Sequence, residues 1–113
     1  MTLKKFHIYL ADLGARYGTE PGKIRPVVVV QTDLLNNAHF STIVCPITTA
    51  VIKESSLLRV HLSKRETHLK TDSDILVDQI RAIDNRRLIK EIGQLNKEDK
   101  NHLLEDLRVL ILE

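Results

Sequence analysis

A run of four valines, Val27–Val30, is the feature that most constrains how this chain can fold. β-branched residues favour extended backbone, and a continuous apolar run is typical of a strand buried on both faces. Pro26 precedes the run, at a strand start where a missing N–H is tolerated. The glycines and proline of Gly14–Lys23 predict a loop before it. We therefore predict a strand over Arg25–Gln31 that is buried on both faces.

Other short apolar or alternating stretches predict five further strands: Phe6–Asp12, Thr42–Thr48, Leu57–Leu62, Asp74–Ile83 and Ile92–Leu95. Pro46 interrupts the second of these, so we expect that strand to lie at a sheet edge or to be bulged. We expect Asp74–Ile83 to be long and bent. Asp33 is a candidate cap for a short helical turn that ends near Asn37.

The C-terminal segment has a helical pattern. Asn96 is a favourable N-cap, and Asp99 offers a capping-box-like partner three residues later. Apolar residues follow at helical spacing, with acidic residues predicted to face away: Leu103, Leu104, Leu107, Leu110 and Ile111 against Glu98, Asp99, Glu105 and Asp106. Short strands before one amphipathic helix predict a mainly β chain with α (an α+β fold). We expect one domain over residues 1–113, a small curled antiparallel sheet or partly open barrel with the helix attached.

Composition excludes several classes of protein. Hydrophobic residues make up 42% of the chain and charged residues 28%, which is typical of a folded domain. Cys45 is the one cysteine, so neither an internal disulfide nor a Cys/His metal cluster is expected, and a reducing compartment is favoured. Because no segment resembles a signal peptide or a membrane span, we expect a cytoplasmic protein with no membrane partner.

The charge distribution is uneven. Residues 1–70 contain ten Lys and Arg against five Asp and Glu, whereas residues 71–113 contain seven against ten. A basic first part is what binding to a polyanion needs. Chance explains the same asymmetry equally well.

Three places carry candidate functional residues. Arg25 lies at the mouth of the buried strand, where Pro26 restricts it to extended geometry, and its guanidinium fork suits two phosphate oxygens. The alternative is a surface arginine that ends a strand.

Thr48 and Thr49 follow Pro46, where a disturbed strand can turn hydroxyls outward, although threonine is also simply common in strands. Gln79 and Arg81 would point to one face of a strand, about 6–7 Å apart, a spacing suited to RNA. An ordinary exposed polar face is the alternative.

Together these segments resemble the MazF/PemK family of toxin endoribonucleases. The resemblance runs in order from about residue 6 to the C-terminus, through Ile8–Leu13, Glu20–Gln31, Cys45–Thr49, Asp78–Asp84 with Arg87 and Leu88, and Gly93–Glu113. It implies a partly open, SH3-like barrel and a homodimer with an RNA groove near the dimer interface. It also implies metal-independent, sequence-specific cleavage of single-stranded RNA (mRNA) to 2′,3′-cyclic phosphate and 5′-hydroxyl ends.

By position, the resemblance makes Arg25 and Thr48 the catalytic pair and Glu20 a possible acid or base. It assigns RNA contacts to Thr19, Thr49, Gln79 and Arg81. Two positions depart from the family: Pro21 replaces a frequent glutamine, and Asp78 stands where glutamate is commoner.

The chemistry needs little beyond these residues. Holding a 2′-hydroxyl in line with its own phosphate removes much of the entropic barrier, and Arg25 and Thr48 would stabilise the developing charge. No metal or other cofactor is required. The proton transfers stay open, because Arg25 is almost always protonated and Glu20 needs a raised pKa to act as a base.

Other nucleophiles and bases are weaker candidates. The five histidines, His7, His39, His61, His68 and His102, are scattered without a repeated spacing. Cys45 lies mid-strand, where cysteines are usually inert. Specificity is expected from the loops at Gly14–Lys23 and Ile52–Leu58, with base stacking limited to Tyr17.

The rival prediction is a non-catalytic SH3-like binding module, or a toxin of the same fold that inhibits gyrase. The resemblance also implies a MazE-like antitoxin whose disordered tail occupies the RNA groove, and DNA binding by the toxin–antitoxin complex.

Overall fold

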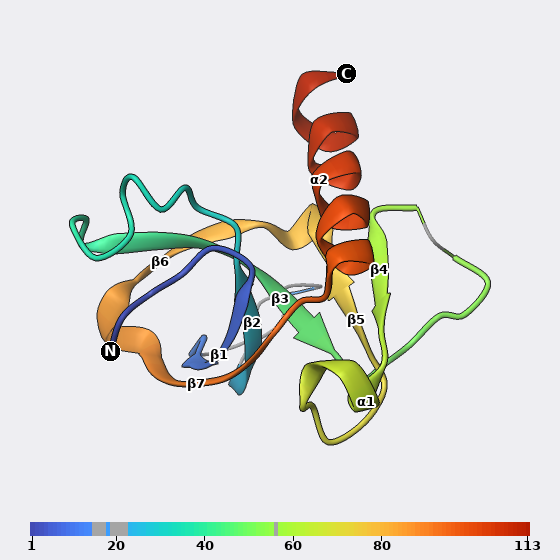
Figure 1. Cartoon of the computed structure of the whole chain (residues 1–113), viewed down its shortest axis with the longest axis horizontal. Helices are drawn as coiled ribbons and strands as arrows, with labels where there is room; N and C mark the ends of the chain where they lie inside the picture. The colour runs from blue at the N-terminus through green and yellow to red at the C-terminus, as the bar shows by residue number, and fades with distance from the viewer. Residues whose placement is uncertain (15–17, 19–22, 56) are drawn as a thin grey trace.

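The computed structural model describes residues 1–14, 18, 23–55 and 57–113 (Figure 1). Within these residues seven strands form an antiparallel sheet in the order β4-β5-β3-β2-β1-β7, and β6 also pairs with β3. The strands are β1 (His7–Asp12), β2 (Ile24–Val29), β3 (Ser41–Thr48), β4 (Arg59–Leu62), β5 (Ser73–Leu76), β6 (Arg81–Asp84) and β7 (Leu88–Gln94). The sheet is open and carries a C-terminal helix, so the predicted architecture is confirmed.

The helical elements are α1 (Lys64–Thr67), α2 (Lys97–Leu112) and two 3-10 turns, η1 (Val77–Gln79) and η2 (Asn85–Arg87). In Figure 1, α2 stands over the sheet beside β4 and β5, while α1 lies at the lower end of these strands. The described helices include none that is both long and apolar enough to cross a membrane.

The four valines lie in two different apolar clusters. Val28 and Val30 belong to a cluster with Leu103 of α2, whereas Val27 and Val29 belong to a second cluster with Tyr9. Successive side chains of a strand point to opposite faces, so β2 is covered on both sides. The prediction of a strand buried on both faces is confirmed for the valines, but the strand spans Ile24–Val29, and its first three residues are exposed or half-buried.

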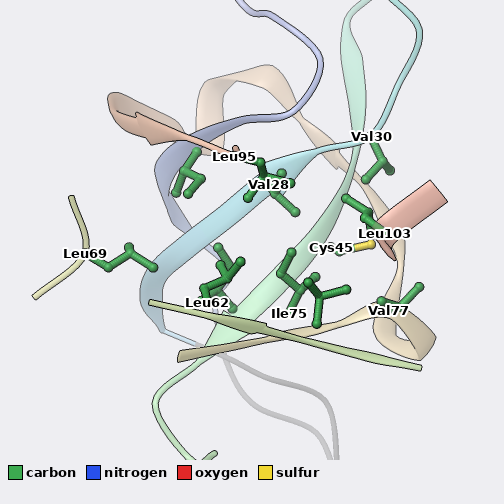
Figure 2. Packing of buried hydrophobic residues seen from close by; sticks show 12 residues of the cluster. Val28, Val30, Cys45, Leu62, Leu69, Ile75, Val77, Leu95 and Leu103 are labelled. Carbon is green, nitrogen blue, oxygen red and sulfur yellow. The ribbon is translucent and has the colours of Figure 1, made fainter. Parts of the chain in front are cut away.

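The first cluster fixes α2 to the sheet. Figure 2 shows Leu103 reaching Cys45 of β3, with Ile75 of β5 and Val77 of η1 alongside. Cys45, Ile75 and Leu103 are all fully buried. We call the surface of the sheet that faces α2 the helix face. We call the opposite surface, which carries the second apolar cluster, the open face, because α2 does not cover it.

Of the two alternatives predicted for β3, the edge strand is wrong, because β3 pairs with β2 on one side and with β6 and β5 on the other. The bulged alternative agrees with a break in its pairing at Pro46. The register with β6 runs to Val44, and the register with β5 resumes at Ile47. Pro46 falls in the gap between them, so its missing N–H breaks no hydrogen bond of a continuous ladder.

The expected single strand Asp74–Ile83 is correspondingly two strands. β5 and β6 are separated by the three residues of η1, which bulge away opposite Pro46. The break in pairing at Pro46 therefore coincides with a break in the partner, between β5 and β6. A proline-containing strand can remain central under these conditions.

The predicted helix α2 is confirmed, including its N-cap: the Asn96 side chain accepts a hydrogen bond from the Asp99 N–H at 2.8 Å. The predicted division of its faces is partly wrong. Leu103 is buried, but Leu104 and Ile111 are exposed. Asp106 is buried instead of facing away, and its Oδ2 atom accepts no hydrogen bond from the described residues.

Smaller differences concern boundaries. The segment after Asp33 forms turns, including a helical one closed by the bond from the Asn36 N–H to the Thr32 carbonyl, but its cap is Thr32 and not Asp33, because Thr32 Oγ1 accepts from the Leu34 N–H. β4 starts at Arg59, two residues later than expected, and β7 starts at Leu88, four residues earlier. The short helix α1 was not predicted.

Candidate functional site

The pairing registers place the two predicted catalytic residues on neighbouring strands. β2 and β3 pair antiparallel, with Val27 opposite Pro46. The recorded pairing ends at this pair, but β2 begins at Ile24 and β3 ends at Thr48, so the same register, extended by two residues, would bring Arg25 opposite Thr48. Directly opposite side chains of an antiparallel pair lie on one face, with Cβ atoms about 5 Å apart where pairing is kept.

The same row continues across the sheet. Arg25 pairs with Ala11 on β1, and Thr48 pairs with Asp74 on β5, which pairs in turn with His61 on β4. These side chains lie on the open face, because Ala11 belongs to the second apolar cluster and not to the one under α2. We call Arg25, Thr48, Asp74 and His61 the polar row.

Arg81 shares the open face with the polar row. It pairs with Val44 of β3, and Val44 belongs to the second apolar cluster. Thr48 is four residues further along β3, so the two backbone positions are about 13 Å apart. Arg81 therefore lies on the same face as Arg25 and Thr48 but at a distance from them along the sheet.

The structure separates two other predicted RNA-binding residues from the polar row. Gln79 lies in η1 and not on a strand, so the expected alternation with Arg81 does not hold. Thr49 follows β3 and lines a pocket of about 350 Å³ together with Leu10 and Pro26. This pocket opens on the helix face, because Leu10 and Pro26 alternate with residues of the open face. Thr19 and Glu20 lie outside the described residues, as do Tyr17 and Pro21.

Thr48 is held in a tight turn. Its Oγ1 atom accepts a hydrogen bond from the Ala50 N–H at 3.1 Å. This bond uses a lone pair, so the hydroxyl proton remains available to donate to an anionic oxygen. The turn is fixed from β4 as well, because Arg59 Nη1 donates to the Ala50 carbonyl at 3.1 Å.

Asp74 is a fully buried carboxylate that sequence reasoning missed as a site residue. Its Oδ2 accepts from Arg59 Nη1 at 2.8 Å and from the Ile52 N–H at 3.2 Å, and its Oδ1 lies 2.6 Å from His61 Nδ1. Burial raises its pKa, but the hydrogen bonds from Arg59, His61 and Ile52 outweigh burial and bring the pKa below its ordinary value. An aspartate inside a predicted strand, where this residue is rare, was the available signal.

The competing nucleophile and base candidates gain no support. Cys45 is buried beneath α2, and burial, with a smaller effect from Asp78, raises the pKa of its thiol to about 12. His7 pairs with Glu91 at the outer strands. No group of three metal-ligating side chains occurs among the residues that the structure describes.

Fold and site together define a class: a small open antiparallel sheet that carries a cationic, hydroxyl-containing row on strand ends. The family model for the PemK-like, MazF-like toxins of type II toxin–antitoxin systems matches residues 4–111. The chain therefore belongs to the PemK/MazF toxin family.

Relatives agree with this assignment. The chain is 35% identical over 109 residues to endoribonuclease EndoA of Bacillus subtilis (strain 168), which covers 96% of this chain and 94% of the relative. The fold is similar to that of MazF from Deinococcus radiodurans, with a TM-score of 0.83 at 20% identity, covering 100% of this chain and 99% of the other. It is also similar to the MazE–MazF structure from the same organism, with a TM-score of 0.76 at 20% identity, covering 98% and 97%.

Proposed function

We propose that this chain is a toxin endoribonuclease that cleaves single-stranded RNA at specific sequences, with Arg25 and Thr48 as its catalytic pair. The observation that supports the proposal is the pairing of β2 with β3, whose register, if extended past Val27 and Pro46, brings the two side chains opposite each other on the open face. The likeness to an enzyme named endoribonuclease EndoA supports the same activity.

The proposed reaction is an internal transesterification. The RNA 2′-oxygen attacks the adjacent phosphorus, and the bond from phosphorus to the 5′-oxygen breaks. A 2′,3′-cyclic phosphate forms, and the departing 5′-oxygen takes up a proton as a 5′-hydroxyl. Attacking and leaving groups belong to one strand, so holding them in line removes much of the entropic cost.

Arg25 and Thr48 would act on the charge that develops on the phosphate oxygens. A guanidinium offers a planar fork to two of these oxygens, and the Thr48 hydroxyl donates to one. Donors already in place require no reorganisation in the transition state. Glu20 remains the candidate proton acceptor, and the reaction as proposed needs no metal ion.

The test is cleavage of a long RNA by the purified protein in EDTA. We expect discrete fragments with cyclic phosphate and 5′-hydroxyl ends. Thr48→Val, which keeps the side-chain shape, and Arg25→Gln should each lower kcat about 10²–10³-fold, the usual effect of losing one preorganised donor.

Matched controls are Thr2→Val and Arg86→Gln, which alter exposed residues outside the polar row and should retain full activity. If the wild-type protein does not cleave the RNA, the nuclease proposal is wrong, and the remaining candidates are a binding module or a gyrase inhibitor of the same fold. Full activity in the Arg25 and Thr48 variants would move the active site elsewhere.

We further propose a MazE-like antitoxin whose disordered, acidic tail covers the open face near Arg25 and Arg81. The family assignment and the similarity to the MazE–MazF structure support this partner. A tail bound there would exclude RNA by occupying the same cationic groups. Co-expression with the neighbouring reading frame should yield a complex without nuclease activity, and separate elution of the two chains would contradict it.

A further inference from the structure

We propose that His61 and Lys53 form a second phosphate-binding subsite, which holds an RNA phosphate next to the scissile one. This inference rests on the proposed endoribonuclease function and adds to it. Lys53 lies in the loop Ile52–Leu58, from which the sequence predicts specificity, but neither Lys53 nor His61 was itself predicted to contact RNA. The observations that carry it are the position of His61 in the polar row, its fixed ring and the pocket beside it.

His61 belongs to the same row as the proposed catalytic pair. Thr48, Asp74 and His61 follow one another on β3, β5 and β4 by direct pairing. Two strand spacings separate the backbones of Thr48 and His61, about 10 Å. This separation is too large for the two side chains to share one phosphate, but it fits successive positions of one RNA strand laid across the row.

A contact with Asp74 fixes the orientation of the His61 imidazole ring. Its Nδ1 lies 2.6 Å from Oδ1 of the buried Asp74 carboxylate. A carboxylate only accepts hydrogen bonds, so Nδ1 carries a proton and the ring presents Nε2 on its other side. The His61 side chain is 38% exposed, so a ligand can reach the ring.

A pocket of about 310 Å³ lies beside the ring. His61, Lys53 and Ser63 line it, with Val51 and Leu62 as apolar walls. Lys53 is exposed on the loop that leads from Thr48 to β4. An ammonium, a hydroxyl and a histidine ring that can carry a second proton meet at this pocket, and together they suit a phosphodiester.

Four further charged groups surround His61. Asp74 of β5 and Arg59 of β4 form an ion pair at 2.8 Å, so their charges offset each other. Asp72, before β5, lines the pocket, and its Oδ1 accepts from the Lys64 N–H of α1 at 3.0 Å. With Lys53 included, a protonated His61 makes the pocket net positive.

Phosphate binding at His61 is coupled to protonation. Nε2 donates to a phosphate oxygen only in the doubly protonated ring, because Nδ1 already donates to Asp74. An RNA strand that occupies the subsite therefore favours proton uptake. The RNA therefore binds the doubly protonated ring more tightly than the singly protonated one.

The experiment uses the wild-type protein and a fluorescent RNA that carries the mapped cleavage site, with 2′-deoxyribose at the scissile nucleotide. Binding is measured by anisotropy from pH 5.5 to 8.5 and over a range of salt concentrations. The variant is His61→Asn, whose amide can replace Nδ1 as donor to Asp74 but presents no outward nitrogen. The control is His102→Asn, a partly exposed histidine on α2, which packs on the helix face and not on the open face.

We expect the His61→Asn variant to bind RNA about tenfold more weakly than wild type at pH 6, which is the size of one charge-assisted hydrogen bond. Most of this difference in affinity should disappear by pH 8.5. Lys53→Gln should reduce the slope of log affinity against log salt by about one. In single-turnover assays on the natural RNA, saturating enzyme should restore the rate of His61→Asn to within about threefold of wild type, because the residue contacts a non-scissile phosphate.

Shortening the RNA from the side that occupies the subsite should abolish the difference between His61→Asn and wild type. If neither shortening changes that difference, or if the two proteins bind alike at pH 6, the subsite does not exist. Wild-type protein that leaves RNA intact would instead refute the proposed nuclease function, and the subsite with it.

Discussion

At the scale of a single residue, Asp74 shows that the candidate site has a cost in folding stability. It is 0% exposed, and an unpaired carboxylate in that place would be strongly destabilising. Arg59, His61 and the Ile52 N–H offset this cost. The same three bonds connect the turn after Thr48 to β4, so the charge that they satisfy also keeps the proposed catalytic hydroxyl in place.

Replacing Arg59 should therefore destabilise the fold in a pH-dependent way. Arg59→Met leaves Asp74 buried without its guanidinium partner, and we expect the free energy of unfolding at pH 7 to fall by about 2–4 kcal/mol. A carboxyl with a lowered folded-state pKa contributes stability above its unfolded pKa, near 3.9, and loses it as the pH falls through the folded value. The difference between variant and wild type should thus shrink below about pH 4.

Urea unfolding at pH 7 and at pH 3 measures both quantities. Arg108→Met is the matched control, because Arg108 pairs with Glu105 on the exposed surface of α2 and such pairs contribute little. Equal destabilisation by the two arginine variants, or a constant difference at all pH values, would contradict this account of Asp74.

At the scale of elements, the contact between β7 and α1 depends on one glycine. A Cβ atom added at Gly93 would lie 2.1 Å from the carbonyl oxygen of Thr67, and that backbone cannot move aside cheaply. α1 also supports α2, because the Asn96 side chain that caps α2 donates to Glu66. Gly93 therefore allows three elements to meet.

Gly93→Ala should lower the free energy of unfolding by about 2–3 kcal/mol, the cost of forcing an atom into a filled space. Thermal unfolding followed by circular dichroism is the measurement. Gln94→Ala, at the exposed neighbouring position on β7, should stay within about 0.5 kcal/mol of wild type. An unchanged melting temperature for Gly93→Ala would mean that α1 moves away freely.

The spacing of apolar residues in the sequence predicted those elements whose apolar side chains form a long run or stripe. The strand at Val27–Val30 and the helix α2 have such patterns and were found at nearly the expected places. α1 is only four residues long, which is too short for such a pattern, so periodicity could not predict it. Pro46 was misleading, because the compensation for its missing N–H lies in η1, more than 30 residues away.

The candidate site shows the same limit. Motifs pointed to Arg25 and Thr48, and the sheet register later set them on neighbouring strands. Motifs could not indicate Asp74 or His61, because these residues join the polar row only through pairing of β3, β5 and β4. Such pairings bring together segments that are remote in the chain, and nothing local in the sequence encodes them.

At the scale of the whole molecule, the surface retains large apolar side chains that one chain does not cover. Phe40 is 91% exposed and Leu34 is 88% exposed, both on the loop between β2 and β3. Ile43, at the start of β3, is 38% exposed. Exposed apolar side chains gathered in one region are typical of protein interfaces. The resemblance to the toxin family implies a homodimer, and we predict that this loop contributes to its interface.

The wild-type chain should sediment as a dimer at micromolar concentration, and Phe40→Ser should weaken the dimer at least tenfold, because buried aromatic side chains dominate interface energies. Leu57→Ser is the control: Leu57 is 76% exposed on the loop before β4, remote in sequence from the β2–β3 loop. Analytical ultracentrifugation of the three proteins over a concentration series separates the outcomes. A wild-type monomer would refute the dimer. A dimer weakened by Leu57→Ser and not by Phe40→Ser would instead place the interface beside the polar row, where it would compete with RNA for the same strands.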